Sequence, residues 1–232
     1  MKKTLAQKPV LFTILLFIAA MFAAAAFTIL FSAVGLRTVS SSLGRVIVAL
    51  ALILAFRSCF HWENSFKGIG YALPALILAV WNVAYNLLTG AALTTDILPV
   101  VLSAFAPALF EETIFRVIPF QKMQDNGMSA LRTVIVTSLI FGLIHLTNIV
   151  GGDVVNTLIQ TGYATAIGLL FGGIYVLTKD PVSVILLHFL TDFTSQIFEN
   201  GSSAPVWSVF LMLAMLIPMY RIKIHAAADA KA

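Results

Sequence analysis

The sequence predicts an all-α, polytopic membrane protein with about eight transmembrane helices. Of its 232 residues, 60% are hydrophobic and only 10% are charged, and the mean hydropathy is +0.99. These values lie far from those of soluble globular domains. The apolar residues also form runs close to the length of about 20 residues that a helix needs to cross the hydrocarbon of a bilayer. We therefore expect an integral, multi-pass protein embedded in the lipid bilayer.

The candidate membrane spans are predicted from these apolar runs. They cover residues 9–36, 46–60, 68–91, 97–120, 131–150, 154–177, 182–198 and 205–220. The second is the weakest, because Arg45 and Arg57 bracket a short apolar core and one or both must extend to the interface. A cleaved signal peptide is the alternative to the first span, but its apolar stretch is longer than a signal sequence needs. Without a repeat or a soluble segment, residues 1–232 are predicted to form a single membrane domain.

The basic residues predict the orientation of the chain. If the N-terminus is cytoplasmic, the inner segments hold 11 Lys and Arg residues, whereas the outer loops hold 2, Arg37 and Arg45. Cytoplasmic loops of membrane proteins carry such an excess of positive charge. Both termini are therefore expected to be cytoplasmic. No basic run with interleaved aromatic residues occurs, so no nucleic-acid partner is expected.

Six ionisable residues fall inside the predicted spans. They are spread over the fourth, fifth and seventh runs: Glu111, Glu112, Arg116, His145, His188 and Asp192. A charged side chain at bilayer depth costs about 2.5–3.5 kcal/mol on insertion scales. We therefore expect the three helices to pack together, with these side chains around a shared polar pocket.

The spacing of these residues supports a shared pocket. Glu112 and Arg116 are four residues apart on one helix face and can pair, as can His188 and Asp192. Glu111 lies about 100° around the helix from Glu112, so only one of the two carboxylates is expected to face the pocket. Counted at about 1.5 Å per residue, the groups meet near the midplane, with the pocket opening toward the cytoplasm.

The residue types point to hydrolysis. A carboxylate beside histidines can act as a general base toward water. Histidines from separate helices can donate to a developing oxyanion or bind a metal. No serine or cysteine has a motif that would make it a nucleophile.

At these residues the chain resembles the CPBP family of intramembrane proteases, which includes CAAX prenyl proteases and bacteriocin-processing (Abi) proteins. The family pattern EExxxR, FxxxH and HxxxN or HxxxD is met in order by Glu111-Glu112-xxx-Arg116, Phe141-xxx-His145 and His188-xxx-Asp192. The resemblance implies a catalytic core at about residues 97–198. It also implies an endopeptidase acting on a membrane-associated protein or peptide, and we expect it in the plasma membrane of a bacterium.

The resemblance also implies roles for these residues. Glu111 would be the base that activates water, with His145 holding and polarising that water. His188 and Asp192 would stabilise the oxyanion, and Arg116 with Glu112 would fix their helix. Because ionised Asp cannot donate a hydrogen bond, Asp192 is more suited to orienting His188 or binding a metal. Phe141 is expected to wall the pocket.

Two questions remain open from the sequence. Glu111, His145, His188 and Asp192 form a feasible zinc ligand set, but the HExxH spacing of soluble zinc proteases is absent, so we favour metal-free catalysis by glutamate and water. A non-catalytic immunity or scaffold protein of the same fold, or a proton-coupled transporter, could also use these residues. The transporter is disfavoured because no inverted repeat is recognisable.

Overall fold

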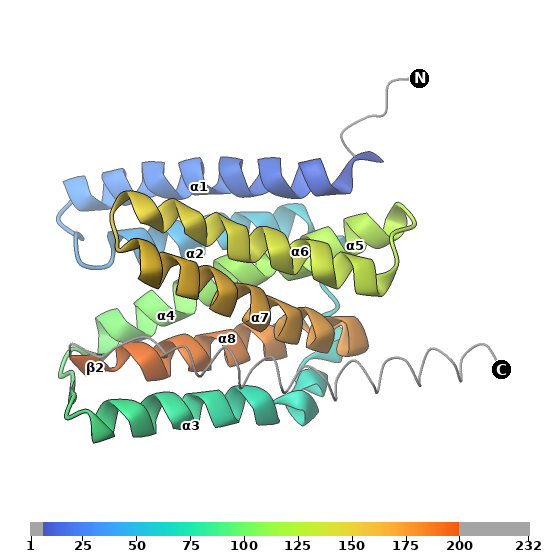
Figure 1. Ribbon diagram of the computed structural model, residues 1–232. Coiled ribbons are helices and arrows are strands. Elements are labelled where there is room, and N and C mark those ends of the chain that lie inside the picture. Colours follow the sequence, from blue (N-terminus) through green and yellow to red (C-terminus); the bar gives the residue numbers. More distant parts are fainter. Residues whose placement is uncertain (1–6, 200–232) are drawn as a thin grey trace.

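The computed structural model describes residues 7–199, and within this part the chain is almost entirely helical, as predicted (Figure 1). The predicted span 205–220 lies outside the described residues. The α-helices are α1 Pro9–Ala33, α2 Ser40–Ala55, α3 Leu73–Leu88, α4 Ile97–Glu112, α5 Ile118–Asp125, α6 Ala130–Ile144, α7 Val154–Thr178 and α8 Pro181–Gln196.

Short elements connect these helices. Three 3₁₀ turns join α2 to α3, a π-helical turn joins α4 to α5, and a 3₁₀ segment follows α6. Their bounds are η2 Arg57–Cys59, η3 Trp62–Asn64, η4 Lys67–Tyr71, η5 Thr113–Val117 and η6 His145–Val150. Two short strands, β1 Ala92–Leu93 and β2 Phe198–Glu199, pair antiparallel and tie the start of α4 to the end of α8.

The helices account for the predicted membrane spans only in part. Among residues 7–199, four helical segments are long and apolar enough to cross a bilayer: residues 9–33, 97–125, 130–150 and 154–178. A fifth exists if α2 and the turns after it, bent by 82°, are counted together. The second predicted span extends to residue 60, but helix α2 ends at Ala55. The chain then turns into the 3₁₀ helix η2, which begins at Arg57. The protein is a polytopic membrane protein, and the count of eight spans stays a prediction.

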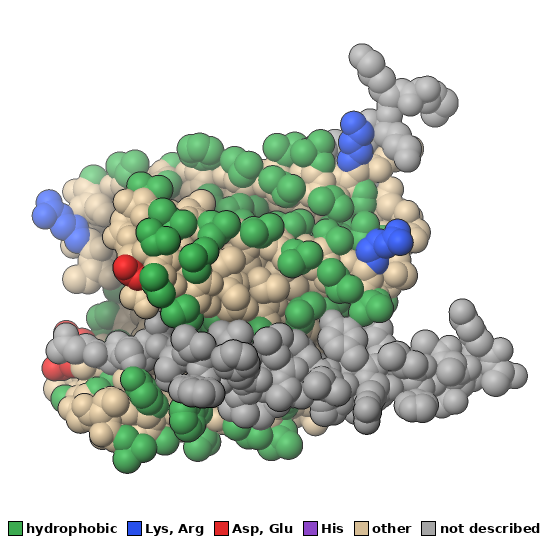
Figure 2. All heavy atoms as spheres, viewed as in Figure 1, with side chains coloured by type: hydrophobic (Ala, Val, Ile, Leu, Met, Phe, Trp, Pro, Cys, Tyr) green, Lys and Arg blue, Asp and Glu red, His purple; other side chains and the backbone are tan. Residues whose placement is uncertain are grey.

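The centre of the bundle is α4. It packs against α2 on one side and α8 on the other, while α1 covers α2 and α3 covers α8. Helices α6 and α7 pack together across one face of this row (Figure 1). Large apolar side chains cover the outer faces, and the charged side chains in view gather at the two ends of the bundle (Figure 2). This distribution is the one expected of helices that run across a bilayer.

Asp180 fixes the start of α8. Its carboxylate accepts hydrogen bonds from Ser183 N at 3.0 Å and Gly68 N at 2.9 Å, and from the Ser183 hydroxyl. The first bond caps the helix, and the second ties η4 to it. The side chain is fully buried, although its place between two apolar runs predicts a loop residue. Asp180 therefore sets the position of the helix that carries His188 and Asp192.

Gly142 allows α6 and α7 to approach closely. A Cβ atom at this position would lie 1.8 Å from Thr165 Oγ1 and 2.9 Å from the Thr161 carbonyl oxygen. We expect Gly142→Ala to lower the free energy of unfolding by about 1–3 kcal/mol, because a backbone carbonyl cannot move aside as a side chain can. The measurement is the unfolding free energy in mixed micelles.

Gly162 on α7 provides the matched control. No atom lies within 4 Å of a Cβ added there. Gly162→Ala should leave the stability unchanged or raise it slightly, because alanine favours the helix. An equal loss of stability in both variants would contradict the close contact at Gly142.

Candidate active site

Glu111 and Glu112 are the last two residues of α4, directly before the π-helical turn Thr113–Val117. Pro119, two residues beyond this turn, cannot donate a backbone hydrogen bond, and its ring crowds the carbonyl four residues earlier. A widened turn at this point relieves that crowding and keeps the helix continuous. The two acidic residues thus lie where the regular helix is interrupted, near the middle of the segment 97–125.

The two neighbouring carboxylates have different surroundings. The side chain of Glu112 is 0% exposed, and its Oε1 accepts a hydrogen bond from Arg116 Nη1 at 2.9 Å and another from His188 Nδ1 at 2.7 Å. The side chain of Glu111 is 20% exposed and lines a cavity. Glu112 therefore joins α4 to α8, while Glu111 remains open to a reactant.

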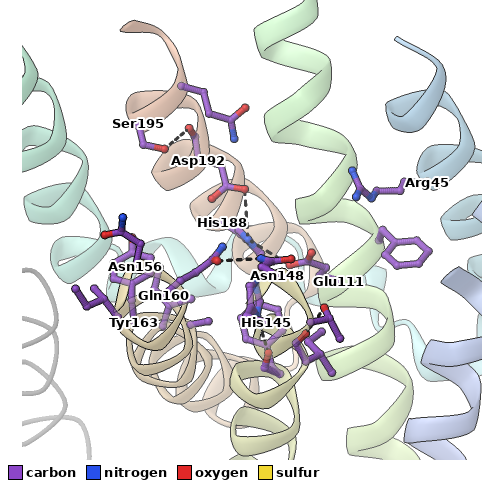
Figure 3. Close-up of a pocket in the computed structure, with 18 of the residues that line it drawn as sticks. Arg45, Glu111, His145, Asn148, Asn156, Gln160, Tyr163, His188, Asp192 and Ser195 are labelled. Atoms are coloured by element: carbon purple, nitrogen blue, oxygen red, sulfur yellow. Dashed lines mark hydrogen bonds and ion pairs between the residues drawn. The ribbon is translucent and has the colours of Figure 1, made fainter. Parts of the chain in front are cut away.

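His188 lies between three carboxylates. With Nδ1 bound to Glu112, its Nε2 lies 3.8 Å from Glu111 Oε2 and 3.6 Å from Asp192 Oδ2. Figure 3 shows Glu111, His188 and Asp192 turned toward one another from α4 and α8. Because a carboxylate only accepts hydrogen bonds, Nδ1 must carry a proton. When Nε2 is protonated as well, it presents a donor between Glu111 and Asp192.

His145 caps the end of α6 and lines the same cavity. Its Nδ1 lies 2.8 Å from the carbonyl oxygen of Phe141, which can only accept, so Nδ1 carries the proton. In the neutral ring this leaves the lone pair on Nε2 free for a water or a substrate N–H group. His145 thus supplies an acceptor on the wall formed by α6.

Phe141 packs against each part of the site. Its ring lies 4.2 Å below Arg116 Cζ, 5.0 Å from the ring of His145 and 6.2 Å from the ring of His188, all measured to ring centroids. The contact with the guanidinium is a cation–π interaction inside the bundle. Phe141 lines the cavity, and it also holds the ion pair of Glu112 and Arg116 in place.

The cavity has a volume of about 640 Å³ and brings together side chains from α1, α2, α3, α4, α6, α7 and α8. Besides the residues predicted from the motifs, its walls include polar side chains that sequence reasoning did not assign to the site: Arg45, Asn82, Thr147, Asn148, Asn156, Gln160, Tyr163, Ser195 and Gln196. Figure 3 shows several of them around His145 and His188, including the amide pair in which Asn148 donates to Gln160. Asn82 and Gln160 stand within apolar runs, which is a signal that the sequence does contain.

The cavity opens at the end of the bundle that carries the α6–α7 connection. Thr147, Asn148 and Asn156 are exposed at this end. The opposite side of the site is closed by the buried rings of Phe120, Phe171 and Tyr175. Helix α1 begins at the other end of the bundle (Figure 1). The predicted opening of the pocket toward the cytoplasm stays a prediction, because it depends on which end of the bundle lies on the cytoplasmic side.

The described residues do not fit a metal ion held by three side chains. Among residues 7–199, no group of three His, Cys, Asp or Glu side chains is placed to bind one together. Nδ1 of His188 is occupied by Glu112, and Nδ1 of His145 by a backbone carbonyl. Hydrogen bonds of this kind also orient metal-bound histidines, but among residues 7–199 the side chains that could bind a metal do not converge on one point.

The family comparison agrees with the motifs. Residues 92–194 match the Rce1-like family, described as type II CAAX prenyl endopeptidase Rce1-like. The match includes all the motif residues, and it confirms the expected resemblance to the CAAX proteases. No curated protein matches the chain.

Proposed function

With residues 92–194 recognised as similar to type II CAAX prenyl endopeptidases, we propose that the protein hydrolyses a peptide bond of a membrane-associated protein or peptide. One observation carries the proposal: Nε2 of His188 lies 3.8 Å from Glu111 and 3.6 Å from Asp192, while its other nitrogen is held by a buried carboxylate. An ion pair that only stabilises the fold does not need a second carboxylate that is partly exposed to a cavity, as that of Glu111 is. A base, an oriented donor and room for a substrate are what peptide hydrolysis requires.

In the proposed mechanism, Glu111 is the general base. It takes a proton from a water, and the oxygen of that water attacks the carbonyl carbon of the scissile bond. His145 Nε2 accepts a hydrogen bond from the same water and directs it. The proton held by Glu111 then passes to the departing amine, so that the carboxylate is restored when the C–N bond breaks.

His188 stabilises the negative charge that develops on the carbonyl oxygen. A protonated Nε2 donates to this oxygen, and Glu112 keeps the ring in position through Nδ1. Asp192 cannot donate when ionised, so its proposed role is to orient the Nε2 side of the ring. Arg116 acts through Glu112 and does not touch the substrate.

The proposed substrates are proteins or peptides anchored at the membrane, because the site lies within a bundle whose outer face is apolar. Processing of a prenylated protein or of a bacteriocin is compatible with this class. We propose the plasma membrane of a bacterium as the location, with both termini in the cytoplasm as the charge distribution predicts.

The test uses the full chain reconstituted in vesicles with lipid-anchored peptides, and cleavage products identified by mass spectrometry. We expect the wild-type protein to cleave and His145→Ala to lose activity by about 10²-fold or more. His61→Ala is the control, because His61 pairs with Glu63 at the surface and does not line the cavity. Equal activity in all three proteins, or no cleavage by the wild type, would overturn the proposal. The second result would favour the non-catalytic scaffold.

Removal of divalent metals should leave cleavage unchanged. The donors around His188 do not converge as three metal ligands among residues 7–199, and water activation by Glu111 needs no metal. The measurement is kcat/KM after dialysis against a chelator, with and without added zinc. A loss on dialysis that zinc alone restores would show that Glu111, His145, His188 and Asp192 rearrange around a metal.

A further inference from the structure

Arg45 lines the same cavity as Glu111 and His145, but from α2, which carries none of the motifs. It is the one Lys or Arg side chain among the described residues of the cavity wall. Figure 3 shows it reaching from α2 toward α4, the helix that carries Glu111. Helix α2 is held close to α1 at the preceding residue, where a Cβ on Gly44 would lie 2.6 Å from the Ala24 carbonyl oxygen.

The guanidinium of Arg45 has no hydrogen-bond or ion-pair partner within residues 7–199. Glu112 is occupied by Arg116 and His188. Glu111 and Asp192 lie near His188, and no ion pair within 4.0 Å joins either of them to Arg45 in the described part of the chain. A half-buried arginine without an acceptor among residues 7–199 presents five N–H donors to a ligand in the cavity.

The negatively charged side chains of the cavity lie around His188, whereas the positively charged side chain of Arg45 lies apart from them. Carboxylates surround His188, so an anionic group of a ligand is repelled there, whereas Arg45 attracts it. Phe17, Met21 and Phe110 also line the cavity and give it apolar walls. A peptide can therefore lie along these walls with a carbonyl group at Glu111 and an anionic group at Arg45.

We infer that Arg45 forms a binding subsite for a carboxylate of the peptide substrate. The inference rests on the proposed function, since it concerns the substrate of the same cavity. The planar guanidinium pairs with a carboxylate through two parallel hydrogen bonds. This carboxylate is either the C-terminal carboxylate of the peptide or the side chain of an Asp or Glu residue. In both cases the carboxylate bound by Arg45 determines how many residues away from it the peptide is cleaved.

The test compares three versions of a short, palmitoylated apolar peptide. The first has a free C-terminal carboxylate, the second a C-terminal amide, and the third an amide together with Glu as its last residue. Binding is measured by fluorescence on the full chain in vesicles, in a Glu111→Gln background that prevents turnover. Cleavage is measured separately in the active protein, so that a failure of catalysis and a failure of the subsite give different results.

With Arg45 present, the free acid, the amide that ends in Glu, or both should bind about 10- to 100-fold more tightly than the plain amide. Arg45→Gln should remove this preference and leave binding of the amide unchanged. The third peptide identifies the source of the carboxylate, because it binds as tightly as the free acid only if a side chain is accepted. Arg37→Gln is the control, since Arg37 is an exposed residue between α1 and α2 and does not line the cavity.

Arg45→Lys is included in case the glutamine variant does not fold. Lysine keeps the charge but not the paired hydrogen bonds, so its preference for the acid should be intermediate. Equal binding of all three peptides to the protein with Arg45, equal effects of Arg45→Gln and Arg37→Gln, or no binding of any of the peptides would overturn the inference. Cleavage without a preference for the acid would leave the proposed function standing. Arg45-dependent binding without cleavage by the active protein would support the subsite and contradict the proposed function.

Discussion

Glu111→Gln is expected to lower kcat for peptide cleavage by about 10²- to 10⁴-fold, the contribution of a positioned general base. Glutamine has nearly the same shape, but it cannot take a proton from water at neutral pH. KM should change little, because the substitution removes an interaction with the attacking water and leaves the cavity walls in place. The measurement is steady-state cleavage of an anchored peptide by the two proteins in the same vesicles.

The loss of activity in Glu111→Gln should not result from unfolding or from the removal of any carboxylate. Its side chain is 20% exposed, so Glu111→Gln should unfold at the temperature of the wild type. Glu63→Gln serves as the control, because Glu63 is exposed and pairs only with His61 among the described charges. A Glu111→Gln variant with wild-type kcat would remove the base from the proposed mechanism.

Glu112→Ala is expected to destabilise the fold by about 3–5 kcal/mol, as when one partner of a buried ion pair is removed. The substitution removes the carboxylate that pairs with the guanidinium of Arg116, whose side chain is only 1% exposed. It also removes the acceptor of the hydrogen bond from His188 Nδ1. The measurement is the free energy of unfolding in mixed micelles. Cleavage should fall as well, because the ring of His188 is no longer held.

The double variant Glu112→Ala/Arg116→Met separates these two effects. Removing the cation together with its partner should recover part of the stability, so the two substitutions should not be additive. Activity should not recover, because Nδ1 of His188 still lacks its acceptor. Additive losses of stability would contradict the coupling between Glu112 and Arg116, and recovered activity would contradict the positioning role of Glu112.

Local spacing predicted the contacts that lie within one helix. The i,i+4 pair of Glu112 and Arg116 forms as expected, and Glu111 faces the cavity because it lies about 100° around the helix. The apolar runs likewise located the described helices, although α2 ends earlier than predicted. These features depend on helix geometry and hydrophobicity, which a single sequence contains.

Contacts between helices could not be predicted in the same way. The hydrogen bond from His188 to Glu112 joins residues 76 positions apart, and it depends on how α4 packs against α8. The motif spacing suggested only Asp192 as the partner of His188. The polar wall formed by Arg45, Asn148 and Gln160 also depends on packing, as does the direction in which the cavity opens.

The central claim is that a water activated by Glu111 attacks the peptide bond. It is tested most directly by a single turnover with excess protein in water labelled with heavy oxygen, followed by mass spectrometry of the new C-terminal carboxylate. Attack by water predicts one labelled oxygen in the product of the first turnover. An unlabelled first product, with the label appearing only in later turnovers, would mean that a protein carboxylate had supplied the oxygen, and it would contradict the account.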